Sequence, residues 1–318
     1  MVYENTAALP RQELTDVVTE SMTSNGMFIG DSILPAYPLK LKNAHYTKIT
    51  VAAADLMRAT TSVRAPGSGF DRWQAAVSDC SITLPQYGEE IPIPDEQTDI
   101  YDSYFAFESF FAMETGNRLK RLNEILIQAQ VQNATNFDAV NSGVAYTVAN
   151  VATNSFIGDV IDAITRVNAR GETPNTIALS WNVYNRVRQA TLVKNFIVGI
   201  NGVGSQVTVN TLQRAFADMG ITQVLVGRAY VNQSAQNSST TINPIWNDTY
   251  VFIGNCQTGQ MQGGGVGRNF YWEKLGGLYA MKSYRDEPKA SNVVRGESAP
   301  SPVIVNTRAG TLITTQYS

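Results

Sequence analysis

Apolar side chains recur at spacings of three and four across residues 99–133, the pattern of one face of an α-helix. The stripe consists of Tyr104, Phe107, Phe111, Thr115, Leu119, Leu122, Leu126 and Ala129. At 1.5 Å per residue such a helix would span roughly 50 Å, whereas the mean helix has only about 11–12 residues. We therefore expect a strut that crosses the molecule, weakened near its middle by Gly116.

Residues 45–93 predict one long β-hairpin. The outgoing limb starts at Tyr46, the tip at 64–72 is dense in turn residues, and the return limb runs from Trp73 to Leu84. A two-stranded hairpin is marginally stable on its own. This one must therefore lie on another surface, either its own domain or a neighbouring subunit.

Residues 1–44 have the pattern of an arm. A short helix is expected from Arg11 to Ser24, with Leu14, Val17, Val18 and Met22 on one side. Pro35 and Pro38 then force an extended backbone. The apolar side chains of this segment need a partner to cover them.

Helices and strands alternate between residues 155 and 255. We expect Ser155 to cap a helix that Gly171 ends, and Ser180 to cap a helix over 181–189 after the strand 174–180. Asn210 is the expected cap of a third helix that ends at Gly220. Further strands are predicted at 221–231 and 249–253, and the chain becomes rich in strands again from Phe270 onward.

Composition narrows the class of protein. The chain has 318 residues, of which 43% are hydrophobic, so it can bury a core, and only 16% are charged. Its polar surface must come mainly from uncharged groups, which cost little to bury against another subunit. The net charge of −3 does not favour a protein that binds nucleic-acid phosphates. Neither a secretory signal nor a long apolar segment is present.

Catalytic and ligand-binding signals are weak. The single histidine, His45, is either a general base or a side chain at a strand end, and the second interpretation is favoured. Cys80 and Cys256 do not have the spacing of a metal site. The glycine clusters at 199–204 and 263–267 lack the Lys-Ser/Thr of a phosphate loop. The carboxylates between 95 and 102 could bind a cation, but the start of the helix explains them better. We expect no catalytic residue, cofactor or metal.

The order of these elements resembles the major capsid protein of tailed bacteriophages, which has the Hong Kong 97-type fold. Four stretches carry the resemblance, and their order matters more than any one of them. They are residues 91–96 (Ile-Pro-Ile-Pro-Asp-Glu) before the long helix, 174–180 (Pro-Asn-Thr-Ile-Ala-Leu-Ser), 279–286 with Tyr284-Arg285-Asp286, and 303–313 with Ala309-Gly310-Thr-Leu-Ile313.

The resemblance covers essentially the whole chain and implies an α+β fold with four parts. These parts are an N-terminal arm at 1–44, an extended hairpin loop at 45–93, a peripheral domain at 94–155 and 270–318 that contains the spine helix 99–133, and an α/β axial domain at 156–269. It also implies that the hairpin lies over a neighbouring subunit, that the arm contacts adjacent capsomers, and that axial domains meet at the centres of hexamers and pentamers.

The implied function is that of a structural protein, not an enzyme. Copies of the chain would assemble into an icosahedral virus capsid around double-stranded DNA, without binding a DNA sequence and without a membrane. The expected location is the virion, after assembly in the cytoplasm of a bacterial host. The resemblance further implies a portal protein and a decoration protein as partners. Since nothing resembling a scaffolding region precedes the arm, we expect a separate scaffolding protein.

Particular residues follow from these expectations. Arg64, Phe70, Arg72 and Trp73 at the hairpin tip are the candidate contacts, because arginine and aromatic side chains are enriched where proteins meet. Gly116 is the candidate bend of the spine helix, with a packing role as the alternative. Some related capsids are crosslinked through a lysine of the hairpin. Because no lysine occurs between Ile49 and Leu119, we expect no such crosslink here.

Two other functions remain open. An encapsulin-type compartment resembles the same fold but would enclose enzymes instead of DNA. A hydrolase or transferase that uses Asp and Glu side chains would be a small oligomer with a deep pocket. The particle and its contents distinguish the three.

Overall fold

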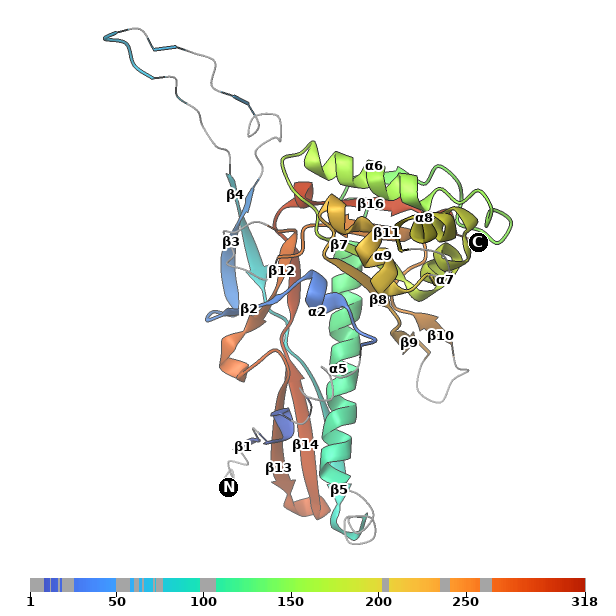
Figure 1. The fold of residues 1–318 in the computed structure, drawn as a ribbon. Coiled ribbons are helices and arrows are strands. Elements are labelled where there is room, and N and C mark those ends of the chain that lie inside the picture. The colour runs from blue at the N-terminus through green and yellow to red at the C-terminus, as the bar shows by residue number, and fades with distance from the viewer. Residues whose placement is uncertain are drawn as a thin grey trace.

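An elongated body, a compact α/β end and a projecting hairpin make up the structure (Figure 1). The computed structural model describes residues 9–11, 13–16, 18, 26–49, 58–59, 63–64, 66–70, 72, 77–97, 107–201, 206–234, 241–257 and 265–317. The expected α+β class is confirmed. Helix α5 runs along the body, and the α/β end lies at its C-terminal end.

The predicted spine helix is present as α5, Phe107–Val131. Residues 99–106 of the predicted range lie outside the described residues, and the helix ends close to the predicted residue 133. The prediction of which side chains are buried is confirmed in the first half of α5, where Thr115 and Leu119 of the apolar stripe are buried.

The stripe is wrong in the second half of α5. Ala129 is exposed, and Leu122 and Leu126 are only partly buried. The side chains that are buried there instead are Asn123, Glu124, Ile127 and Val131. Two polar residues occupy buried positions because their hydrogen bonds are satisfied within the protein, and an apolar count cannot find such positions.

A four-stranded sheet packs beside the N-terminal half of α5. Its order is β1 (Leu9–Pro10), β13 (Ala280–Asp286), β14 (Ser291–Ser298) and β5 (Tyr87–Pro94), all antiparallel. Strand β5 belongs to this sheet, although the range predicted for the extended hairpin, 45–93, included most of it. Pro85 separates β5 from the hairpin, and an eight-residue register with β14 holds it here.

The N-terminal segment contributes to the same body. Leu14 and Val18 are buried against Ile93 and Met281, as the predicted helical side requires. The rest of the predicted helix 11–24 lies largely outside the described residues. Farther along, α2 (Gly30–Ile33) contacts α5. The described parts of the arm therefore pack on their own chain.

A small sheet links the body to the hairpin. Strand β12 (Gly267–Trp272) lies between β15 (Ser301–Ile304), to which it is antiparallel, and β2 (Ala36–Leu39), to which it is parallel. Phe270 of β12 is fully buried and packs against Ile82 and Leu84 at the base of the hairpin.

The α/β end is built on a five-stranded sheet. Its order is β6 (Ala139–Asn141), β16 (Gly310–Thr314), β11 (Tyr250–Gly254), β7 (Thr176–Ser180) and β8 (Gln223–Gly227). Strand β7 is buried at every position, as expected for a strand covered on both faces. Ile177 and Leu179 face the helices α6 (Phe156–Asn168), α7 (Trp181–Gln189), α8 (Thr191–Asn201) and α9 (Val209–Phe216).

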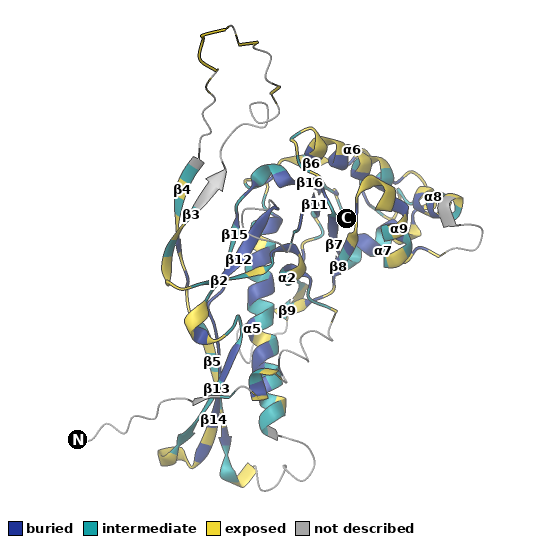
Figure 2. Cartoon of the chain, turned by 60° about the vertical axis from the view of Figure 1, so that its left-hand side comes forward, coloured by how far each residue is buried: buried dark blue, intermediate teal, exposed yellow. Residues whose placement is uncertain are grey.

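The other face of this sheet rests on the C-terminal end of the spine. Ala178, Phe252 and Leu312 alternate with the helix-facing residues and pack in one cluster with Ile127 and Val131 of α5. Figure 2 shows the resulting three layers, with buried residues in the strands between the α/β helices and α5. The sheet also includes β6 and β16, which the predicted ranges assign to the peripheral domain, so the two parts interlock.

The predicted helix caps are partly correct. The Ser180 side chain accepts from the Val183 N–H, as expected. Ser155 precedes α6 but makes no capping hydrogen bond. Its hydroxyl oxygen accepts from the Val144 N–H instead, and its hydroxyl donates to Asp159. Asn210 is not a cap: Thr208 caps α9, in a reciprocal pair with Thr211. The predicted strand 221–231 is divided into β8 and β9 (Tyr230–Asn232), and α8 includes Gly199 of the first glycine cluster.

Candidate subunit contact surfaces

In the described residues, the hairpin packs on the body at its base. Strand β3 (Asn43–Ile49) pairs antiparallel with β4 (Val77–Thr83). Ala44 and Tyr46 face inward with Ile82, and the Tyr46 ring lies 6.2 Å from that of Phe270. Figure 1 shows the two strands rising from the body, away from α5. A two-stranded ribbon held in this way has unpaired edges on both sides.

His45 is on the outer side of this ribbon. Its Nδ1 lies 3.3 Å from Oδ2 of Asp79, and both side chains are more than 70% exposed. The position is that of a strand side chain in solvent, as the favoured interpretation expected. Ser81 lies opposite His45 in the strand register, but in the described part of the chain no hydrogen bond joins these two side chains.

At the hairpin tip the structure brings together two of the four predicted contact residues. The Arg64 guanidinium stacks over the Phe70 ring, with 4.7 Å between its Cζ and the ring centroid, and its Nε donates to the Ser68 carbonyl at 2.7 Å. Phe70 is still 76% exposed. Arg72 is exposed as well, and Trp73 lies outside the described residues. The tip therefore presents an apolar ring and positive charge to solvent.

A second projection from the body was not predicted from the sequence. Strands β9 and β10 (Ile242–Pro244) form a hairpin on the α/β end. Tyr230 is 43% exposed and Ile242 is 60% exposed. Their register places both side chains on one face of the ribbon. The one sequence feature that could have drawn attention to this projection is the absence of any charged residue from 229 to 247.

Gly116 lies inside α5 and is buried. Helix α5 continues through it without interruption. Both roles suggested by the sequence, a bend and a packing position, are compatible with this place, so the bend stays a prediction.

The acidic residues before the spine helix do not form a metal site in the described part of the chain. Asp95 accepts two hydrogen bonds from the Arg285 guanidinium, at 2.5 and 2.6 Å. These bonds lower the pKa of the Asp95 carboxyl. Asp99 and Asp102 lie outside the described residues.

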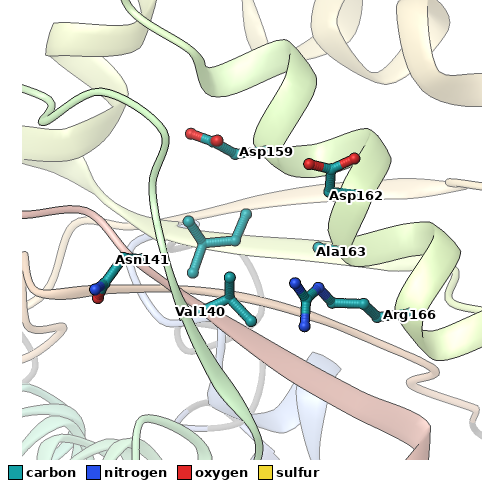
Figure 3. A pocket seen from close by; sticks show the side chains of 7 residues that line it. Val140, Asn141, Asp159, Asp162, Ala163 and Arg166 are labelled. Atoms are coloured by element: carbon teal, nitrogen blue, oxygen red, sulfur yellow. The ribbon is translucent and has the colours of Figure 1, made fainter.

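One hollow lies between α6 and the edge strand β6 (Figure 3). Asp159, Asp162 and Arg166 of α6 line it opposite Val140 and Asn141. Its volume of about 20 Å³ suits one water molecule, whereas ligand pockets usually measure ~300–1,000 Å³. The hollow does not offer the deep site that a hydrolase needs.

Asp159 in this hollow has a structural role. Its carboxylate accepts from the Gly143 N–H, the Ser155 hydroxyl and the Tyr146 hydroxyl. Burial, followed by the nearby Asp159 charge, raises the pKa of Tyr146. These bonds tie the loop after β6 to the first turn of α6.

Among the helices of the described residues, none combines the length and the hydrophobicity of a membrane-spanning segment.

Comparison with known proteins gives no match to a family model and none to a curated protein sequence. The fold, in contrast, matches solved structures over nearly its whole length. A phage-related protein from Bordetella bronchiseptica has 14% sequence identity and a TM-score of 0.68, with 98% of each chain covered.

Two further matches are capsid structures. The capsid of the cyanophage P-SCSP1u has 12% identity and a TM-score of 0.61, covering 92% of this chain and 88% of its own. A putative capsid protein of a prophage of Escherichia coli CFT073 has 12% identity and a TM-score of 0.57, and the match covers 96% of this chain and 99% of that protein. With its spine helix, projecting hairpin and α/β end, the chain therefore has the Hong Kong 97-type fold of phage capsid proteins.

Proposed function

We propose that the chain is a structural protein that assembles with copies of itself into the icosahedral shell of a virus capsid. The observation that carries this proposal is the agreement of fold, over more than nine-tenths of the chain, with a cyanophage capsid and a putative prophage capsid protein. The exposed ring of Phe70, at the tip of a hairpin whose described contacts with the body lie at its base, supports it, since such a projection gains stability from a neighbouring subunit.

The parts of the subunit receive the roles that the resemblance implies. The hairpin in 45–93 lies over the next subunit, the arm in 1–44 contributes to contacts between capsomers, and the axial domain, 156–269, meets its copies at the centres of hexamers and pentamers. The peripheral domain, 94–155 and 270–318, forms the wall between these centres. Contacts repeated by closed symmetry add up, so each can be weak.

The proposed cargo is double-stranded DNA, which the shell encloses without adhering to it, because a weakly acidic chain does not attract nucleic-acid phosphates. No sequence-specific contact is proposed. A separate scaffolding protein, a portal protein and a decoration protein are proposed partners. The particle is built in the cytoplasm of a bacterial host and becomes the head of the virion. The subunit has no catalytic role in this proposal.

An encapsulin-type compartment is less favoured, since phage and prophage capsids are prominent among the matched structures. Purified particles decide between the two by their contents. Nuclease-protected DNA supports the virus capsid, and a folded enzyme with no DNA would replace it with the compartment.

Variants at the hairpin tip test whether the hairpin makes subunit contacts. We expect Phe70→Ala and Arg64→Ala to lower particle yield in sedimentation velocity, because truncating a side chain that is buried between subunits costs about 1–2 kcal/mol. Each 1.4 kcal/mol corresponds to about tenfold in the concentration needed for association. The thermal midpoint of the isolated subunit should not change, since Phe70 is exposed there.

Val148→Ala is the matched control, because Val148 is also exposed, at 60%, but lies in a loop of the α/β end. Its particle yield should equal that of the parent. Tip variants that assemble as well as this control would show that the tip contacts nothing.

A further inference from the structure

One carboxylate, that of Glu124, joins three separate parts of the subunit. It projects from α5 and is only 1% exposed. Its Oε1 accepts from the Ile29 N–H at 2.9 Å and from the Trp246 indole N–H at 2.6 Å, and its Oε2 accepts from the Gly30 N–H at 2.9 Å. The N-terminal segment, the spine and the α/β end therefore meet at one side chain.

Asn123, the preceding residue of α5, extends the junction. Its amide nitrogen donates to Asp31 and to the Tyr279 hydroxyl, both at 2.9 Å. Its amide oxygen accepts from Asn269 of β12, also at 2.9 Å. Two neighbouring polar residues of the spine thus hold four distant segments by directional bonds, where apolar side chains would give contacts without a fixed register.

The ionisable groups around Glu124 are Asp31 on α2, Lys120 on α5 and Tyr279 before β13. Burial raises the pKa of Glu124, and its three hydrogen bonds offset part of that effect. Burial likewise raises the pKa of Asp31 and of Tyr279 and lowers that of Lys120. The positive charge of Lys120 opposes the effect of burial on Asp31.

The fit at the junction is close. A Cβ atom added at Gly30 would lie 2.6 Å from Oε2 of Glu124 and 2.9 Å from Cδ1 of Ile127. At Gly227 of β8 a Cβ atom would lie 2.2 Å from the Trp246 ring. Both glycines therefore let the N-terminal segment and the Trp246 loop come within hydrogen-bonding reach of one carboxylate.

We propose that Glu124 is the positioning residue of a joint that fixes the α/β end and the base of the N-terminal arm on the spine, and so sets the angle between subunits in the shell. This inference rests on the proposed function, because the angle matters only in an assembly. A loose joint would leave each part folded but would allow several angles. The shell would then lose uniformity before the subunit loses stability.

Hydrogen exchange of the full-length subunit tests the joint directly, with Glu124→Gln as the variant. Glutamine keeps one oxygen, which we expect to stay on the two donors of Oε1, and places an NH₂ group against the Gly30 N–H. Exchange at Gly30 should therefore rise at least tenfold and clearly more than at Ile29. If the Glu124 side chain only filled space, Glu124→Gln would change the exchange rates of the Ile29 and Gly30 amides equally or would change neither. Either result would overturn the proposal.

The second measurement is the size distribution of assembled particles by cryo-electron microscopy. Glu124→Gln and Gly30→Ala should give mixed sizes or open shells, while Glu114→Gln, a half-exposed position on the same helix, should match the parent. Uniform particles from Glu124→Gln would overturn the positioning role and leave the capsid function standing. A parent chain that forms no particles would instead remove the capsid function and the positioning role with it, even if the exchange result holds.

Discussion

Opposing effects act on the carboxylate of Glu124. Removal from water disfavours its charge, whereas three donors favour it. The net result is a pKa above the 4.5 of an ordinary glutamate, with burial as the main cause. Replacement by alanine would leave three buried donors without an acceptor, at about 1–3 kcal/mol each.

This raised pKa predicts how stability depends on pH. Between pH 4.5 and the raised value, the folded subunit keeps a proton on Glu124 that the unfolded chain has released. The free energy of unfolding should therefore fall as the pH rises through that window. Asp31 contributes in the same direction, so Glu124→Gln should reduce the slope without abolishing it.

Denaturant unfolding of the isolated subunit at a series of pH values measures this slope. Val148→Ala, which changes no ionisable group, provides the control and should keep the slope of the parent. Equal slopes in the parent and in Glu124→Gln would contradict a protonation change at Glu124.

Single residues were predictable from the sequence where the cause is local. Ser180 caps α7 because its hydroxyl needs only the N–H three residues later. Thr208 was missed because Asn210 is as good a cap by type, and only the packing of Leu212 and Phe216 fixes where α9 begins. Glu124 could not be predicted, because its three partners are distant in sequence.

At the scale of elements, α5 and β14 approach closely because Gly296 has no side chain. A Cβ atom there would lie 2.6 Å from Cγ2 of Thr115 and 3.0 Å from Cδ1 of Leu119. Gly296→Ala should therefore push the helix from the sheet and lower the free energy of unfolding by about 1–3 kcal/mol.

Calorimetry of the subunit measures the effect, with Gly158→Ala as the control. Gly158 lies in α6 with open space around its Cα, so alanine should stabilise that helix by roughly 0.5–1 kcal/mol. An unchanged stability for Gly296→Ala would mean that the helix and sheet are not in tight contact.

Gly116→Ala addresses the bend predicted for the same helix. Alanine favours the helix by about 1 kcal/mol over glycine, so a helix that must bend during shell expansion should resist it. We expect expansion of assembled shells to slow or stop, as followed by particle diameter over time. Expansion at the rate of the parent would leave Gly116 with a packing role alone.

Helices and strands were predictable where the hydrophobic period agrees with the turn residues that flank it, as in α5 and in the strands β3 and β4 on either side of the tip. The strand with which each strand pairs was not predictable in this way. Strand β5 fell within the range given to the hairpin because its partner, the distant β14, cannot be identified from the local sequence. Local sequence likewise does not show that β6 and β16 pair with each other in the sheet of the α/β end.

At the scale of the whole molecule, the subunit has projections that its own body does not cover. The hairpin tip and the β9–β10 face expose Phe70, Tyr230 and Ile242. The order of elements along the sequence was enough to predict this architecture. Which surfaces meet in the proposed shell depends on how a second copy is placed, and the fold of one chain does not determine that placement.

The sequence also predicts that one kind of covalent crosslink is absent from the proposed shell. Because no lysine lies between Ile49 and Leu119, the hairpin tip cannot donate the side chain of an amide crosslink. Denaturing electrophoresis of intact particles should show single subunits. A ladder of linked subunits would contradict this expectation.

Electron microscopy of the purified full-length protein tests the central claim most directly, namely that this fold is completed by identical copies. We expect closed shells of uniform size, on the order of tens of nanometres across, built from fivefold and sixfold clusters of the subunit. A protein that stays monomeric at high concentration, and appears only as small globules in the micrographs, would contradict it.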